Sequence, residues 1–195
     1  MQTPDNIWIY VFFVLFAITL QIIMIFFREV ARLVPANYII LGLFTICESY
    51  FVAFICQCFC YDGYTNSFSQ DSYRALGAAA GMTLGLVAGI TTYAWTTKTD
   101  FTVAMGFIWV FGMTFMMLSL FAIFFYNFIF EMLWCALGVL LFGIYLIIDT
   151  QLILGKGRYY LSIEDYILGA MILSVDIFIL FIYIFIYLLY LCASK

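Results

Sequence analysis

The chain contains long runs without a charged residue, and these runs constrain its fold more than any other feature. Seven Lys or Arg and eleven Asp or Glu residues are spread over 195 positions, and most of them stand between the runs. A helix needs about 20 apolar residues to cross the hydrocarbon core of a membrane. Six runs have that length, and they predict spanning helices at residues 6–27, 36–61, 75–97, 103–126, 132–154 and 164–192.

The composition of the chain indicates that lipid is the solvent of these helices. Hydrophobic residues make up 68% of the chain and charged residues 9%, whereas a soluble domain has about 25% charged residues. Backbone exposed to lipid must form its own hydrogen bonds, and the uninterrupted runs lack the alternation of barrel strands. We therefore predict an all-α fold, a single integral membrane bundle over residues 1–195. The net charge of −4, without a basic patch, argues against a nucleic-acid partner.

The basic residues divide unequally between the two sides of this predicted bundle. One side carries Arg28, Arg32, Lys98, Lys156 and Arg158, and the other carries Arg74 and Lys195. Loops rich in Lys and Arg remain on the cytoplasmic or matrix side of a membrane. We therefore expect both termini on the side opposite the positive loops.

Glycines mark a predicted packing surface and a predicted helix end. Gly77, Gly81, Gly85 and Gly89 are each four residues apart, so on a helix they form one stripe that a neighbouring backbone can approach closely. We interpret this stripe as a seam between two packed helices. Gly155 stands just past the fifth predicted helix and is expected to end it.

Three acidic residues lie inside the predicted helices, namely Glu48, Asp149 and Asp176. A charge at the bilayer centre costs about 2.5–3.5 kcal/mol on insertion scales, so such residues indicate an ion or proton site. Counted at about 1.5 Å per residue from the positive side, Glu48 and Asp176 reach similar depths and could meet near the midplane. Asp149 is offset from Asp176 by several ångströms, a gap that helix tilt or an extended helix end could close. Close carboxylates share protons, which suits a gate that opens with pH or an oxygen site for Ca²⁺. The alternative is neutral acids that only hydrogen-bond a neighbouring helix.

No other residues predict a firm metal or catalytic site. The chain has no His, and we interpret Cys56, Cys58 and Cys60 as small apolar side chains of a helix rather than as metal ligands. The one candidate cofactor is Ca²⁺, bound or transported at Asp149 and Asp176. An intramembrane aspartyl protease also needs two facing aspartates, but the Gly-Leu-Gly-Asp surround of such enzymes is absent, so we expect no enzyme.

Several segments follow one another in a fixed order, at residues 35–49, 90–102, 147–151 and 162–177. They are an early helix with a membrane glutamate, a central loop, an Asp-Thr-Gln element and a last helix with its aspartate. In this order they resemble one family of membrane proteins, the transmembrane Bax-inhibitor motif or lifeguard family. The resemblance implies a seven-helix bundle with a central final helix. It also implies a pH-sensitive calcium leak governed by two aspartates, which correspond here to Asp149 and Asp176.

The resemblance further implies an organelle membrane, such as the mitochondrial inner membrane or that of the endoplasmic reticulum or Golgi, and roles in calcium homeostasis and cell-death suppression. The family's first helix has no counterpart, and no basic residue is predicted to latch the aspartates, since Arg28 and Arg32 lie outside the core.

Two hypotheses follow. The chain is a cation leak channel with Glu48 lining its pathway, or it is an accessory subunit of a large membrane assembly in which a partner covers the missing helix.

Overall fold

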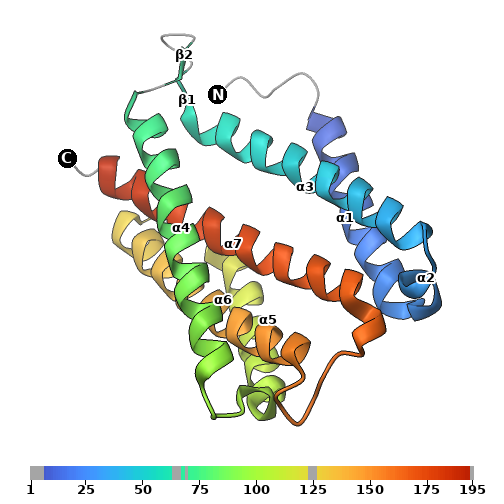
Figure 1. Cartoon of the computed structure of the whole chain (residues 1–195). Coiled ribbons are helices and arrows are strands. Elements are labelled where there is room, and N and C mark those ends of the chain that lie inside the picture. The colour runs from blue at the N-terminus through green and yellow to red at the C-terminus, as the bar shows by residue number, and fades with distance from the viewer. Residues whose placement is uncertain (1–6, 63–66, 69, 123–126, 194–195) are drawn as a thin grey trace. The chain divides into compact units, whose positions relative to one another are not determined.

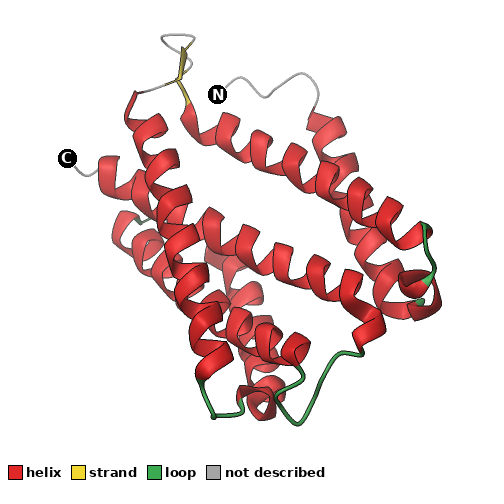
Figure 2. Cartoon of the chain, viewed as in Figure 1, coloured by secondary structure: helices red, strands yellow, loops and turns green. Residues whose placement is uncertain are grey.

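The computed structural model describes residues 7–62, 67–68, 70–122 and 127–193, and nearly all of them are helical (Figures 1 and 2). The α-helices are α1 (Ile7–Phe26), α2 (Arg28–Arg32), α3 (Ala36–Cys60), α4 (Gln70–Thr96), α5 (Met105–Ala122), α6 (Phe128–Leu154) and α7 (Tyr166–Ala193). Two 3₁₀ turns, η1 (Phe101–Ala104) and η2 (Ile163–Asp165), precede α5 and α7. Two short antiparallel strands of two residues each, β1 (Tyr61–Asp62) and β2 (Ser67–Phe68), stand between α3 and α4 in the sequence, and Tyr61 pairs with Phe68.

Six of the described helices are long and apolar enough to cross a membrane, which confirms the predicted all-α membrane fold. The candidate spans are Trp8–Phe26, Ala36–Phe59, Ser72–Thr96, Phe101–Leu120, Ile129–Leu154 and Ile163–Cys192. Helix α4 begins five residues before the predicted position 75, because a helix can continue past the charged Arg74 at the membrane boundary. The predicted first residue of the first span, and the predicted end of the fourth span at 126, lie outside the described residues.

Large apolar side chains cover the outer surfaces of these helices. Trp8, Leu84 and Phe107 are among the most exposed, and the same side chains on a soluble protein would be an aggregation hazard. The helices therefore contact the lipid bilayer through these surfaces.

The chain divides into two compact units. The first unit comprises Met1–Leu76 and Ile163–Met171, and the second comprises Gly77–Ser162 and Ile172–Lys195. Helices α4 and α7 each contribute residues to both units. The prediction of one domain stays a prediction.

The first unit is built on an aromatic contact between α1 and α3. The ring of Tyr10 stacks on Phe54 with centroids 4.1 Å apart, and Phe13 stacks on Tyr50 at 4.5 Å. Residue numbers rise along α1 as they fall along α3, so the two helices are antiparallel. Met24 is completely buried in this unit. In the same unit, η2 is fastened to α2 by ion pairs that Asp165 forms with Arg32.

The core of the second unit lies where α5 and α6 pack together. Ile108, Phe115, Leu141 and Ile148 form a buried cluster, against which Phe101, Met105, Trp134, Tyr145 and Tyr183 pack. The ring of Phe115 stacks on Trp134 at 4.3 Å, and the indole nitrogen of Trp134 donates to the Ser119 hydroxyl at 3.2 Å. Gly155 ends α6 in the left-handed conformation at φ 66°, as predicted from the sequence.

Candidate functional site

The two membrane aspartates meet in the second unit. Asp149 lies near the C-terminal end of α6 and Asp176 near the middle of α7, and their carboxyl groups lie within hydrogen-bonding reach of each other. The two carboxyl groups are therefore not separated by the several ångströms that counting residues along the helices gives. Asp176 is 7% exposed, and its Oδ2 atom has no hydrogen-bond partner among the described residues. A buried carboxyl oxygen without a partner is costly, so the pair has spare capacity to bind a proton or a cation.

Tyr145 stands beside this pair and was missed by the sequence reasoning. It lies one helical turn before Asp149 on α6, close enough for both carboxyl groups to act on it electrostatically. Its hydroxyl donates to the backbone carbonyl of Ile108 on α5 at 2.9 Å. Gly112 provides the room for this contact, because a Cβ atom there would collide with the tyrosine hydroxyl. The spacing of four residues between Tyr145 and Asp149 was the signal available in the sequence.

The end of α6 beyond Asp149 is held by the loop between α4 and α5. The Gln151 side chain is 2% exposed; its Nε2 donates to the Thr99 carbonyl at 2.9 Å, and its Oε1 accepts from the Phe101 amide at 2.9 Å. Sequence reasoning used the Asp-Thr-Gln element only as a mark of resemblance. The structure shows that Gln151 joins two segments about 50 residues apart.

Asp100 fastens the same loop to the segment that follows α6. Its Oδ1 accepts from the Thr102 hydroxyl at 2.6 Å and the Thr102 amide at 3.0 Å, and its Oδ2 accepts from the Arg158 amide at 2.8 Å. These hydrogen bonds, that from the Thr102 hydroxyl above all, hold the pKa of the Asp100 carboxyl below its usual range. Lys156 adds a contact from its amine to the Trp95 carbonyl.

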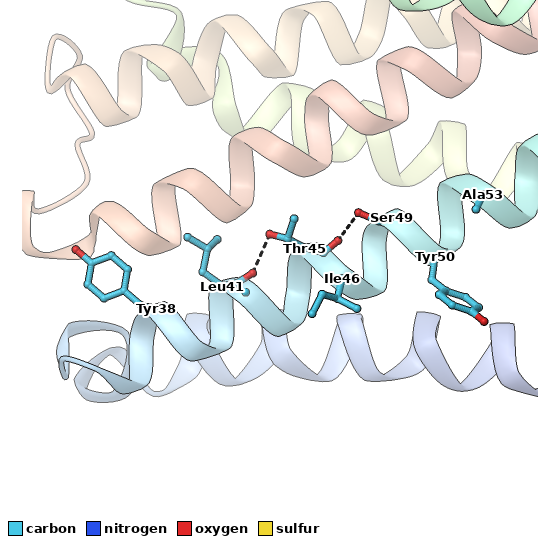
Figure 3. A pocket seen from close by; sticks show the side chains of 8 residues that line it. Tyr38, Leu41, Thr45, Ile46, Ser49, Tyr50 and Ala53 are labelled. Atoms are coloured by element: carbon cyan, nitrogen blue, oxygen red, sulfur yellow. Dashed lines mark hydrogen bonds between the residues drawn. The ribbon is translucent and has the colours of Figure 1, made fainter.

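Glu48, the third predicted acid, belongs to the first unit. It is half-buried on α3 and has an interaction partner. A shallow groove of about 600 Å³ runs along α3, lined by Tyr38, Leu41, Gly42, Thr45, Ile46, Ser49, Tyr50 and Ala53 (Figure 3). The hydroxyl groups in it are turned back onto the helix, since Thr45 donates to the Leu41 carbonyl and Ser49 to the Thr45 carbonyl. Glu48 is not among the lining residues, so its predicted place in an ion pathway stays a prediction.

Among the described residues, nothing packs closely on the predicted glycine seam of α4. Gly77, Gly81, Gly85 and Gly89 are exposed on α4, and no described side chain comes within 4 Å of a Cβ atom built on any of them. The buried face of α4 carries Ala79, Thr83 and Ala94 instead. The close packing of another helix on the glycine stripe therefore stays a prediction.

Asp149 and Asp176 supply only part of the oxygen ligands that a hard cation such as Ca²⁺ needs. Among the described residues, no group of three or more Cys, Asp or Glu side chains converges on one point. Calcium takes six to eight oxygen ligands, and Asp149 with Asp176 supplies at most four. Water or backbone oxygens would have to complete the shell, which suits an ion in transit better than a tightly held one.

Comparison with known proteins gives consistent results over nearly the whole chain. The family described as inhibitor of apoptosis-promoting Bax1 (Bax1-I) matches residues 1–191. Protein lifeguard 3 of Homo sapiens is 31% identical over 190 residues, which are 95% of this chain and 56% of the relative. Protein lifeguard 3 of Mus musculus is 34% identical over 131 residues, which are 65% of this chain and 41% of the relative. The chain thus spans about half the length of these curated relatives.

Proposed function

This chain belongs to the Bax inhibitor, or lifeguard, family of integral membrane proteins, and on that premise we propose that it forms a pH-sensitive leak for calcium. The observation that carries the proposal is the meeting of Asp149 and Asp176, two acids of adjacent helices in hydrogen-bonding reach. An acid in a membrane span is rare without a function, and two that face each other are rarer.

The proposed gate acts through the charge of the pair. One proton shared by Asp149 and Asp176 bonds the two carboxyl groups and lets α6 and α7 stay together. When that proton leaves, two negative charges face each other out of water, where their repulsion is stronger than in solvent. The pair then separates or binds a cation between its oxygens. Calcium flux is therefore expected to rise as pH rises.

Two more residues have proposed roles near the pathway. Tyr145 supports the gate by tying α6 to α5, because its hydrogen bond to the Ile108 carbonyl fixes the face of α6 that carries Asp149. Glu48 is proposed to line the pathway in the first unit, and Glu48→Gln tests that role separately. The positive loops support an orientation with both termini on the far side of an organelle membrane.

The test is calcium flux into liposomes that contain the purified protein and an internal calcium dye. The double variant Asp149→Asn with Asp176→Asn should lose the dependence of flux on pH, because amides neither share a proton nor become charged. Glu29→Gln is a matched control, since it makes the same chemical change on an exposed residue outside the spans. Unchanged pH-dependent flux in the double variant would refute the gate.

A second candidate function, an accessory subunit of a larger membrane assembly, is favoured by the open glycine stripe of α4. Four exposed glycines in one row offer a neighbouring helix a close approach. Extraction in a mild detergent followed by native mass measurement tests it. A particle of one or two chains contradicts this function, and a large particle with fixed partners supports it.

A further inference from the structure

The end of α6 is held by a set of hydrogen bonds that we call the loop clamp, made by the side chains of Gln151, Asp100 and Thr102. Gln151 forms one hydrogen bond with each end of its amide, to the Thr99 carbonyl and to the Phe101 amide, both at 2.9 Å. A side chain with both polar ends bonded to backbone has one allowed orientation. The amide plane of Gln151 is therefore fixed relative to the loop.

Asp100 extends the clamp to the segment after α6. Its two oxygens accept from Thr102 on one side and from the Arg158 amide on the other. Gly157 packs closely against the Asp100 carboxylate, because a Cβ atom at Gly157 would lie 2.6 Å from Asp100 Oδ1. The clamp thus ties the residues on both sides of the α6 terminus to one loop, and all of them belong to the second unit.

Helix ends unwind readily, because their last carbonyl groups lack partners within the helix. Helix α6 ends at Leu154, and Asp149 lies five residues before that end, within reach of such unwinding. Gln151 stands between Asp149 and the end of the helix. An α6 that unwound past Gln151 would lose the turn that aims the Asp149 carboxyl at Asp176.

We propose that Gln151 and Asp100 are positioning residues that keep the last two turns of α6 wound, so that Asp149 faces Asp176. This inference rests on the proposed gate role of the two aspartates. It adds that the loop between α4 and α5, through the clamp, determines how well the pair is formed. A weaker clamp would lower the affinity of the pair for a cation without blocking the pathway itself.

Hydrogen–deuterium exchange measured by mass spectrometry on the full chain in detergent tests the positioning. Gln151→Leu removes both hydrogen bonds and keeps most of the volume. Exchange over residues 146–152 should become about tenfold faster or more, which is the expected cost of losing two hydrogen bonds. Gln57→Leu, the same change at an exposed α3 residue whose side chain is bonded to the Tyr10 hydroxyl, should leave that exchange unaltered. Faster exchange in residues 97–102 alone would overturn the inference.

Calcium flux supplies a second readout that a general loss of stability would not reproduce. In Gln151→Leu the half-saturating calcium concentration should rise several-fold while the maximal flux stays within about twofold. Gln151→Glu keeps the acceptor for the Phe101 amide, so it should show a smaller effect, and it replaces Gln151→Leu if that variant does not fold. An unchanged half-saturating concentration overturns the inference. If the wild-type chain passes no calcium, the proposed function fails, while the exchange experiment still decides whether the clamp holds Asp149.

Discussion

Arg32 donates two hydrogen bonds to the Asp165 carboxylate, from Nε to Oδ1 at 2.7 Å and from Nη2 to Oδ2 at 3.0 Å. The Asp165 side chain is completely buried, and its partner is 133 residues away in the sequence. Glu164 lies 2.9 Å from Nη1 of the same guanidinium, and Arg28 approaches Asp165 only to 4.0 Å. A bidentate contact of this kind fixes both angle and distance. The turn that precedes α7 is thereby fastened to α2 within the first unit.

Loss of Arg32 is expected to destabilise the protein more than loss of Arg28. Arg32→Gln leaves a buried carboxylate without its main counter-ion, which is the costly way to break an ion pair. Arg28→Gln removes an exposed cation at the limit of contact, where ion pairs contribute little. Thermal unfolding in detergent should show a lower Tm for Arg32→Gln and a nearly unchanged Tm for Arg28→Gln. Equal Tm values for the two variants would contradict the structure.

The membrane fold was predictable because charge and hydropathy act locally along the sequence. Most charged residues of the chain stand between the apolar runs, at the membrane surface, so the ends of most predicted spans agree with those of the helices to within a few residues. Long-range pairing has no such local signal. Nothing in the sequence near Arg32 indicates that its carboxylate partner, Asp165, lies 133 residues later.

The candidate site was predictable in its residue types and not in its geometry. An aspartate in an apolar run stands out by its cost, so Asp149 and Asp176 were recognised. Their contact depends on the relative height and tilt of α6 and α7, which counting residues from the loops does not determine. The clamp residue Gln151 gave no signal of its own, because a polar residue near a predicted helix end is usual.

Gly138 is expected to tolerate no larger residue, because Tyr183 packs directly over it. A Cβ atom at Gly138 would lie 2.6 Å from Cδ1 of the tyrosine ring. Gly138→Ala forces that ring to move within a packed core, at a cost of about 1–3 kcal/mol. Its Tm in detergent should fall by several degrees.

The matched control is Gly85→Ala on α4, where a Cβ atom meets nothing within 4 Å. Alanine restricts an unfolded chain more than glycine does and favours the helix by about 0.5–1 kcal/mol. The Tm of Gly85→Ala should therefore stay the same or rise slightly. A fall as large as that of Gly138→Ala would mean that another helix occupies the glycine stripe.

Gly155 is expected to resist replacement for a different reason, its backbone conformation. It holds φ at 66°, a region that costs other residues about 1–2 kcal/mol. Gly155→Ala should lower the free energy of unfolding by about 1 kcal/mol, whereas Gly155→Asn should lower it less, since asparagine adopts this conformation more easily. Equilibrium unfolding in detergent measures the free energy of unfolding of both variants. Equal losses would indicate that Cβ crowding, not conformation, sets the cost.

Asp100 makes the stability of the protein depend on pH in the acidic range. Hydrogen bonds from the Thr102 hydroxyl, the Arg158 amide and the Thr102 amide lower its pKa in the folded state. A carboxyl whose pKa is lowered by folding stabilises the folded state fully above its unfolded value, which is about 3.9. That contribution is lost as pH falls through the folded pKa, because a protonated Asp100 carboxyl group accepts these hydrogen bonds more weakly than the carboxylate does.

The Tm difference between the wild-type chain and Asp100→Asn isolates this contribution. Groups that titrate in both proteins cancel in the difference, whereas Asp100 titrates only in the wild type. The wild type should be the more stable protein by a constant margin between about pH 6 and pH 8, and the margin should shrink below about pH 4. A margin that stays constant down to about pH 2.5 would show that the clamp does not depend on the charge of Asp100, and that its hydrogen bonds serve the neutral acid equally well.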